Sequence, residues 1–107
     1  MTKVEFIYEK GKIVSFTASG HSGYAPEGED IVCASISTAV WMTANALINI
    51  LALDVEYEEK GVCISLKVNE SAVDDSQVML INLKEFLCNL TIEYGKYLTV
   101  KEEHVNV

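Results

Sequence analysis

The chain has 107 residues, of which 50% are hydrophobic, and 16 acidic against 8 basic residues give it a formal net charge of −8. This length supports one hydrophobic core, so we predict a single domain over residues 1–107, and no uninterrupted apolar stretch approaches the roughly 18 residues of a membrane span. The charge argues against nucleic acid as a direct partner and favours a basic polypeptide, although an acidic surface serves solubility equally well.

The N-terminal part of the chain alternates apolar and polar residues. The alternation over residues 2–8 and 13–19, with a turn at 9–12, predicts a β-hairpin. No basic-then-apolar leader precedes this pattern. We therefore expect a cytoplasmic protein with no membrane partner.

Two helices and three further strands follow the hairpin. In chain order we predict a helix from 31 to about 53, a hairpin of strands 54–58 and 62–68, a helix from the polar run 69–76 to Tyr94, and a strand over 97–103. Asp30 is the expected N-cap of the first helix, and Gly95 is expected to end the second in the C′ position. This order favours an α+β fold with two layers, a mostly antiparallel sheet covered by two long helices.

The first helix is more apolar around its circumference than one buried face requires. Ile31, Trp41, Ile48 and Ile50 all fall outside its main apolar stripe. A two-layer fold leaves the outer side of a helix in water, so these residues favour a homodimer built on this helix.

A histidine and a cysteine, His21 and Cys33, stand on either side of a glycine-rich loop that leads into this helix. Cys33 falls in the first helical turn, where the helix dipole favours a thiolate and unpaired amides can stabilise an oxyanion. Gly28 in the loop predicts mobility beside the nucleophile. The structural alternative is a buried thiol and a turn histidine, which are both common.

The remaining cysteines, Cys63 and Cys88, fall in regular elements with no histidine nearby in sequence. With Cys33 they make an odd number in a chain without an export signal, so free thiols are expected rather than disulfides. The spacing of the three cysteines lacks the short repeats of local zinc sites. We therefore expect no metal, and structural roles for Cys63 and Cys88.

Two segments, Gly20-His21-Ser22-Gly23-Tyr24-Ala25 and Asp30-Ile31-Val32-Cys33-Ala34-Ser35-Ile36-Ser37, resemble the signature of the ribosomal-processing cysteine protease family, Prp. The length of the chain and its order of strands and helices resemble this family throughout. One position departs from the pattern, because Ser22 stands where alanine is expected after the histidine. We interpret this change as small, and we expect that it does not touch a proposed catalytic group.

The resemblance implies a homodimeric, cofactor-free cysteine endopeptidase. Its substrate would be the N-terminal extension of a basic large-subunit ribosomal protein of the bacterial bL27 type. Cys33 would be the nucleophile and His21 the general base that activates it and then protonates the leaving amine. Gly20, Asp30 and Ser37 match further motif positions.

The roles of these supporting residues stay open at this stage. Asp30 either orients His21 or caps the helix, and we favour the cap because a carboxylate near Cys33 opposes a thiolate. The Ser37 hydroxyl either reaches the site or bonds back to the carbonyl of Cys33. Tyr24 either flanks the substrate or braces the loop.

Two other functions remain as alternatives to the protease. One is a non-catalytic ribosome-associated binding or assembly factor that acts through its acidic surface, and the other is a thiol acyltransferase. Trp41 is interpreted as a packing or dimer residue, and His104 as a surface residue near the end of the chain.

Overall fold

The computed structural model describes residues 1–26 and 29–105. Its elements in chain order are β1 (Thr2–Glu9), β2 (Lys12–Ser19), α1 (Ile31–Asn45), β3 (Val55–Lys60), β4 (Cys63–Val68), α2 (Val73–Tyr94) and β5 (Leu98–Val105). A short π-helical turn, Ala46–Ile50, continues α1, and a 3₁₀ turn, Glu70–Ala72, precedes α2.

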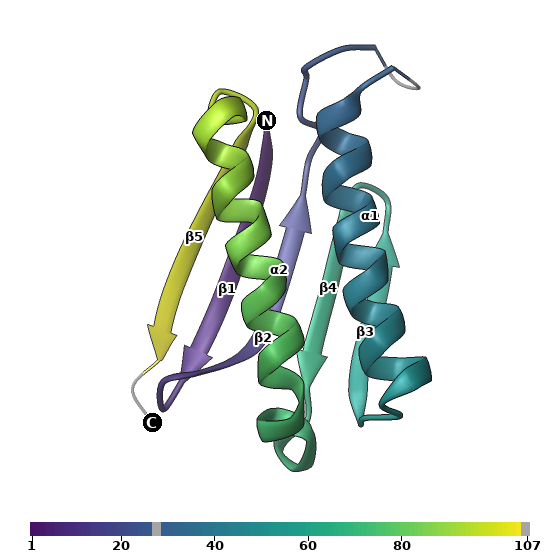
Figure 1. Ribbon diagram of the computed structural model, residues 1–107, viewed down its shortest axis with the longest axis vertical. Helices are drawn as coiled ribbons and strands as arrows, with labels where there is room; N and C mark the ends of the chain where they lie inside the picture. Colours follow the sequence, from purple (N-terminus) through teal and green to yellow (C-terminus); the bar gives the residue numbers. More distant parts are fainter. Residues whose placement is uncertain (27–28, 106–107) are drawn as a thin grey trace.

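The strands form one sheet in the order β3-β4-β2-β1-β5. All neighbouring pairs are antiparallel except β1 and β5, which run parallel from Thr2 beside Leu98 to Glu9 beside Val105. Both long helices cover the same face of this sheet (Figure 1). The predicted two-layer α+β fold with a mostly antiparallel sheet is therefore confirmed.

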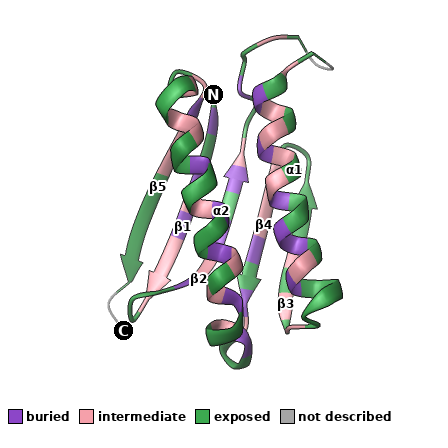
Figure 2. Ribbon diagram, viewed as in Figure 1, coloured by how far each residue is buried: buried purple, intermediate pink, exposed green. Residues whose placement is uncertain are grey.

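The core lies between the sheet and the helices because each strand alternates its side chains between the two faces. Phe6 of β1 lies opposite Phe16 of β2, which lies opposite Leu66 of β4, and all three are buried. The residues beside them in sequence point to the opposite face of the sheet, where Thr17 and Lys67 are exposed and the others are half-buried. Along both helices, buried positions alternate with exposed ones (Figure 2). The buried helix residues that complete the core are Val32, Ile36, Val40 and Ala44 of α1 and Leu80, Leu83 and Leu87 of α2.

The segment Ile31–Ile50 is long and apolar enough, by length and composition alone, to cross a membrane. It is not an uninterrupted apolar stretch, because polar residues such as Ser35 and Thr38 lie within it. The core helix of a globular domain passes the same test, and here one side of α1 is buried against the sheet from Val32 to Ala44.

The second helix differs in detail from its prediction. Gly95 has φ −61°, so it does not adopt the left-handed C′ conformation. A Cβ at Gly95 would lie 2.8 Å from the carbonyl oxygen of Thr91, which gives the glycine a steric role instead. Apolar residues lie on both sides of this helix, because Val78 is 78% exposed while Leu80 is fully buried.

Candidate active site

The connection from β2 to α1 leaves the sheet at Gly20. This residue has φ +87°, and its N–H donates to the carbonyl oxygen of Val62 at 3.1 Å. A Cβ at this position would lie 2.6 Å from the carbonyl oxygen of Met1. Only glycine satisfies both the backbone conformation and the close approach of the N-terminal strand. Gly20 therefore fixes the place at which His21 leaves the sheet.

Asp30 joins the loop to the start of α1. Its backbone is extended, and its Oδ1 accepts the N–H of Cys33 at 2.9 Å, as an N-cap does. Its Oδ2 accepts the Ser22 hydroxyl and the N–H groups of Tyr24 at 3.2 Å and Ala25 at 3.4 Å. The predicted cap is thus observed, and among the described residues no hydrogen bond joins Asp30 to His21.

The hydrogen bonds to Asp30 keep its carboxyl group ionised. Burial raises the pKa of Asp30, but the donors Ser22, Cys33 and Ala25 outweigh this effect and lower the pKa from 3.8 to about 2. The carboxylate therefore holds the loop against the helix across the neutral pH range. Its contact with the Cys33 amide also occupies one of the groups that were expected to stabilise an oxyanion.

Ser22 makes direct contact with the sulfur of Cys33. Its side chain is buried, its N–H donates to Cys33 Sγ at 3.2 Å, and the Cys33 thiol donates to its Oγ at 3.4 Å. The interpretation that Ser22 does not touch a proposed catalytic group is therefore wrong. Sequence reasoning missed this contact because the two residues are far apart in sequence and the loop fold brings them together.

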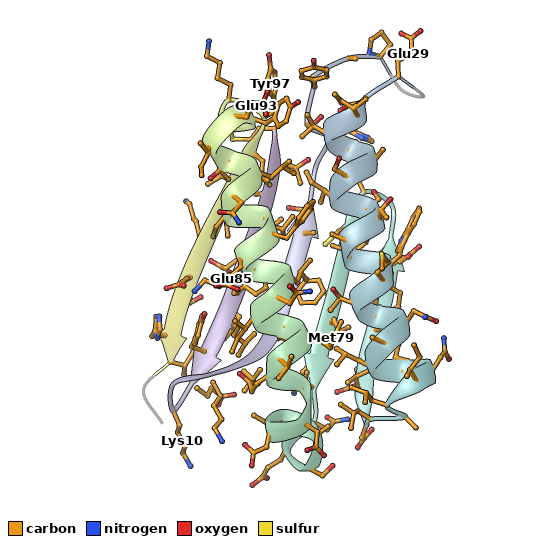
Figure 3. All side chains as sticks on the ribbon, in the orientation of Figure 1. Lys10, Glu29, Met79, Glu85, Glu93 and Tyr97 are labelled. Carbon is orange, nitrogen blue, oxygen red and sulfur yellow. The ribbon has the colours of Figure 1, made fainter. Side chains whose placement is uncertain are left out.

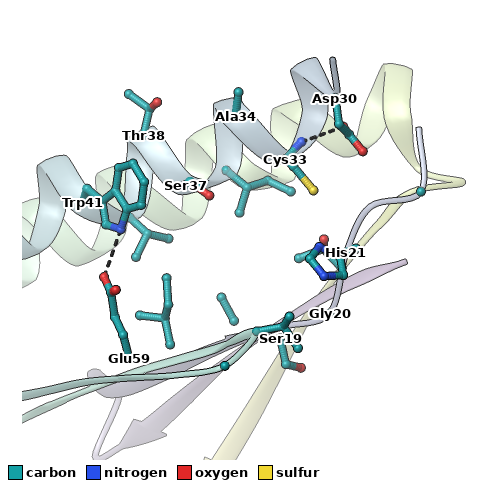
Figure 4. A pocket seen from close by; sticks show the side chains of 18 of the residues that line it. Ser19, Gly20, His21, Asp30, Cys33, Ala34, Ser37, Thr38, Trp41 and Glu59 are labelled. Atoms are coloured by element: carbon teal, nitrogen blue, oxygen red, sulfur yellow. Dashed lines mark hydrogen bonds between the residues drawn. The ribbon is translucent and has the colours of Figure 1, made fainter. Parts of the chain in front are cut away.

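His21 and Cys33 line the same cleft, whose volume is about 710 Å³. His21 is exposed and Cys33 is half-buried. The Cys33 side chain points from the start of α1 toward the part of the loop that carries His21 (Figure 4). In the described part of the structure, no hydrogen bond joins the side chains of His21 and Cys33. The fold thus brings the two predicted residues into one site, with Ser22 holding the sulfur.

The cleft continues along α1, away from the loop. Ser37 and Thr38 of α1 line its wall, and Ile64 of β4 lines the sheet side. Trp41 marks the far end, where its Nε1–H donates to Glu59 Oε1 at 3.1 Å (Figure 4). No local pattern in the sequence places Glu59 in this cleft, because β3 reaches the cleft only through its pairing with β4.

Tyr24 anchors the loop to the other half of the molecule. Its ring packs edge-on against Tyr94 at 5.6 Å and against Tyr97 at 5.2 Å between ring centroids. Figure 3 shows Tyr97 at the same end of the molecule as Glu29, which precedes the N-cap. The sequence left two roles open for Tyr24, flanking the substrate or bracing the loop, and these ring contacts brace the loop. Gly28, where the loop was expected to be mobile, lies outside the described residues.

The other predicted residues lie away from the cleft. Cys63 is half-buried in β4 and Cys88 is exposed on α2, and all three cysteines are free thiols. His104 is exposed on β5, where its ring stacks on Tyr8 with centroids 4.4 Å apart. Among the described residues, no group of three or more His, Cys, Asp or Glu side chains is placed to hold a metal ion.

Comparisons with known proteins give one consistent result. The family model described as cysteine protease Prp matches residues 1–99. The ribosomal processing cysteine protease Prp of Staphylococcus aureus is 25% identical over 92 residues, which cover 84% of this chain and 87% of that protein. A crystal structure of the S. aureus protease Prp with a covalently linked product peptide is similar with a TM-score of 0.85, at 24% identity over 96% of this chain and 100% of that one. A Streptococcus mutans crystal structure is similar with a TM-score of 0.79, at 25% identity over 98% and 96% of the two chains.

Proposed function

Because this chain belongs to the family of the cysteine protease Prp, we propose that it removes the N-terminal extension of a large-subunit ribosomal protein of the bacterial bL27 type. The observation that carries the proposal is the cleft shared by His21 and Cys33, which is open to a peptide along α1. The related S. aureus protease is named for ribosomal processing, and one of its crystal structures holds a substrate peptide.

We infer the following mechanism from the two side chains. The imidazole of His21 takes the proton of the Cys33 thiol, and the sulfur attacks the scissile carbonyl carbon. When the tetrahedral intermediate collapses, the C–N bond breaks and His21 gives the proton to the leaving amine. Water then hydrolyses the thioester, with His21 again as the base. Rotation of the exposed His21 side chain toward the sulfur is required before the first step.

The roles of the supporting residues differ in kind. Asp30 acts by holding the loop and the helix start together, and its pKa of about 2 keeps it ionised at neutral pH. Gly20 sets the position of His21 through its backbone. Ser37 lines the cleft one turn after Cys33, where its hydroxyl can contact a bound peptide.

The direct test is cleavage of a peptide that copies the N-terminus of the matching ribosomal protein. We expect the wild type to cut it and Cys33→Ala and His21→Ala to leave it intact with their fold preserved. Cys63→Ala is the matched control, because it removes a thiol of similar burial outside the cleft. An intact peptide after incubation with micromolar wild-type enzyme, or cleavage by Cys33→Ala, would contradict the proposal.

We also propose a cytoplasmic homodimer formed through the first helix. Met42, Ile48 and Ile50 lie on α1 and the π-helical turn that continues it, and they are 67%, 37% and 72% exposed. Apolar side chains gathered in this way mark interaction surfaces. Sedimentation equilibrium should give twice the mass of the chain, and Ile50→Lys should shift it to the monomer.

A further inference from the structure

The end of the cleft farthest from the loop carries a fixed carboxylate. The Trp41 Nε1–H donates to Glu59 Oε1 at 3.1 Å, and the Tyr57 hydroxyl donates to the same oxygen at 2.5 Å. Glu59 pairs with Ile64 in the sheet, on the face that the helices cover. Burial and the neighbouring Glu59 raise the pKa of Tyr57 to about 12, so its hydroxyl keeps its proton and continues to donate at neutral pH.

The charge of the cleft is uncompensated at this end. The described lining residues include two carboxylates, Asp30 and Glu59, and no lysine. Asp30 accepts hydrogen bonds from the loop and from Cys33, which engage both of its oxygens. Within the described part of the chain, no lysine lies within ion-pair distance of Glu59. Glu59 is thus the carboxylate that can receive a cation from a bound peptide.

The distance from Cys33 to Trp41 along α1 corresponds to a few residues of an extended substrate peptide. Trp41 follows Cys33 by eight positions on α1, which corresponds to about 12 Å along a helix axis. An extended peptide advances about 3.3 Å per residue. A peptide laid along the cleft therefore brings its third or fourth residue from the scissile bond to Trp41.

We propose that Trp41 and Glu59 form a subsite for a lysine or arginine side chain of the substrate, three or four residues from the scissile bond. The indole face and the carboxylate both attract a cation, and their hydrogen bond holds them in place before binding. This inference rests on the proposed protease function, and it names the class of peptide that the cleft prefers.

The test uses the ribosomal N-terminal peptide with all its basic residues replaced by norleucine. Lysine is then placed singly at each of the four positions on either side of the scissile bond, and kcat/KM is measured for every peptide. For the wild type we expect lysine at the third or fourth position on one side to raise kcat/KM about three- to tenfold over norleucine. For Glu59→Gln and Trp41→Ala this gain should disappear.

Two matched controls exclude general charge and helix effects. Glu58→Gln makes the same change of charge one residue away in β3, where alternation points the side chain to the opposite face of the sheet. Phe86→Ala truncates an aromatic side chain of α2 that is 42% exposed and does not line the cleft. Both variants should keep the wild-type preference for lysine.

The proposed subsite and the proposed protease function are tested by separate measurements. The same peptides, fluorescently labelled, are titrated against Cys33→Ala with and without Glu59→Gln, so binding is read without cleavage. Loss of lysine preference in both assays on Glu59→Gln supports the subsite. Equal preference in Glu59→Gln and Glu58→Gln, or a gain confined to the first or second position, overturns it. Absence of any cleavage by the wild type overturns only the proposed function, while the binding titration still decides the subsite.

Discussion

Replacing Asp30 by alanine tests how strongly one carboxylate holds the loop to the first helix. The variant removes the N-cap of α1 and leaves the buried hydroxyl of Ser22 without its acceptor. Loss of an N-cap costs about 1 kcal/mol, and an unsatisfied buried hydroxyl costs about 1 to 3 kcal/mol. We expect Asp30→Ala to lower the free energy of unfolding by about 2 to 4 kcal/mol at neutral pH.

The pH dependence of the free energy of unfolding isolates the contribution of the Asp30 charge. The pKa of Asp30 is lowered from 3.8 to about 2 in the folded protein. The stabilisation is therefore fully present above pH 3.8 and is lost as the pH falls through 2. One pKa unit corresponds to about 1.4 kcal/mol, and partial exposure reduces the value, so the charge contributes about 1 to 2 kcal/mol. The difference in stability between wild type and Asp30→Ala should narrow by about 1 kcal/mol between pH 6 and pH 3.

Urea denaturation of both proteins at several pH values measures this difference. Asp54→Ala is the control, because Asp54 is exposed and makes no side-chain hydrogen bond within the described residues. Asp30→Asn separates the charge from the cap, since asparagine caps helices about as well as aspartate. If the stability of Asp30→Ala matches that of Asp54→Ala, or if its difference from the wild type does not change with pH, the reasoning is refuted.

Three further predictions concern the loop and the start of α1. Gly20→Ala should lower the free energy of unfolding by at least 1 to 2 kcal/mol more than Gly23→Ala, because both glycines have positive φ but only a Cβ at Gly20 meets the backbone of Met1. Urea denaturation measures both variants, and equal losses would contradict the steric argument. Cys33 should react with iodoacetamide at pH 7 faster than Cys63 and Cys88, although Cys88 is the exposed thiol. Mass spectrometry measures the labelling of each cysteine. Ser22→Ala should raise the Cys33 rate about threefold, because the Ser22 hydroxyl donates to Asp30 and accepts the S–H of Cys33, and the variant releases the sulfur from this contact. An unchanged or lower rate would show that the hydroxyl does not restrain the sulfur.

The fold was predictable for elements that a local sequence pattern identifies, such as alternating apolar residues or an N-cap. Alternating residues such as Phe6 and Phe16 identified the first hairpin, and the cap at Asp30 located the start of α1 correctly. The second helix was less predictable in detail. Val78 and Leu80 are both apolar, and only their position relative to the sheet decides that the first is exposed and the second is buried.

The site was predictable as a pair of residues and not as a network. His21 and Cys33 carry their chemistry in their side chains, so a short motif is enough to find them. The hydrogen bonds from Ser22 to Cys33 and Asp30 depend on how the loop folds back, which no periodic pattern encodes. Glu59 and the tyrosines at 94 and 97 reach the cleft and the loop only through tertiary packing.

The parallel pairing of β1 with β5 has a consequence for how the chain folds during synthesis. Thr2 lies beside Leu98, so β1 gains this neighbour only after almost all of the described chain has been made. Most of the described residues that line the cleft belong to β2, β3, β4, α1 and the loop before it, and only Thr2 among them comes from β1. The walls of the cleft that come from the sheet and α1 can therefore form first, whereas the loop gains its contacts with Tyr94 and Tyr97 later. Strand β5 adds the far edge last, at the entropic cost of closing a long loop.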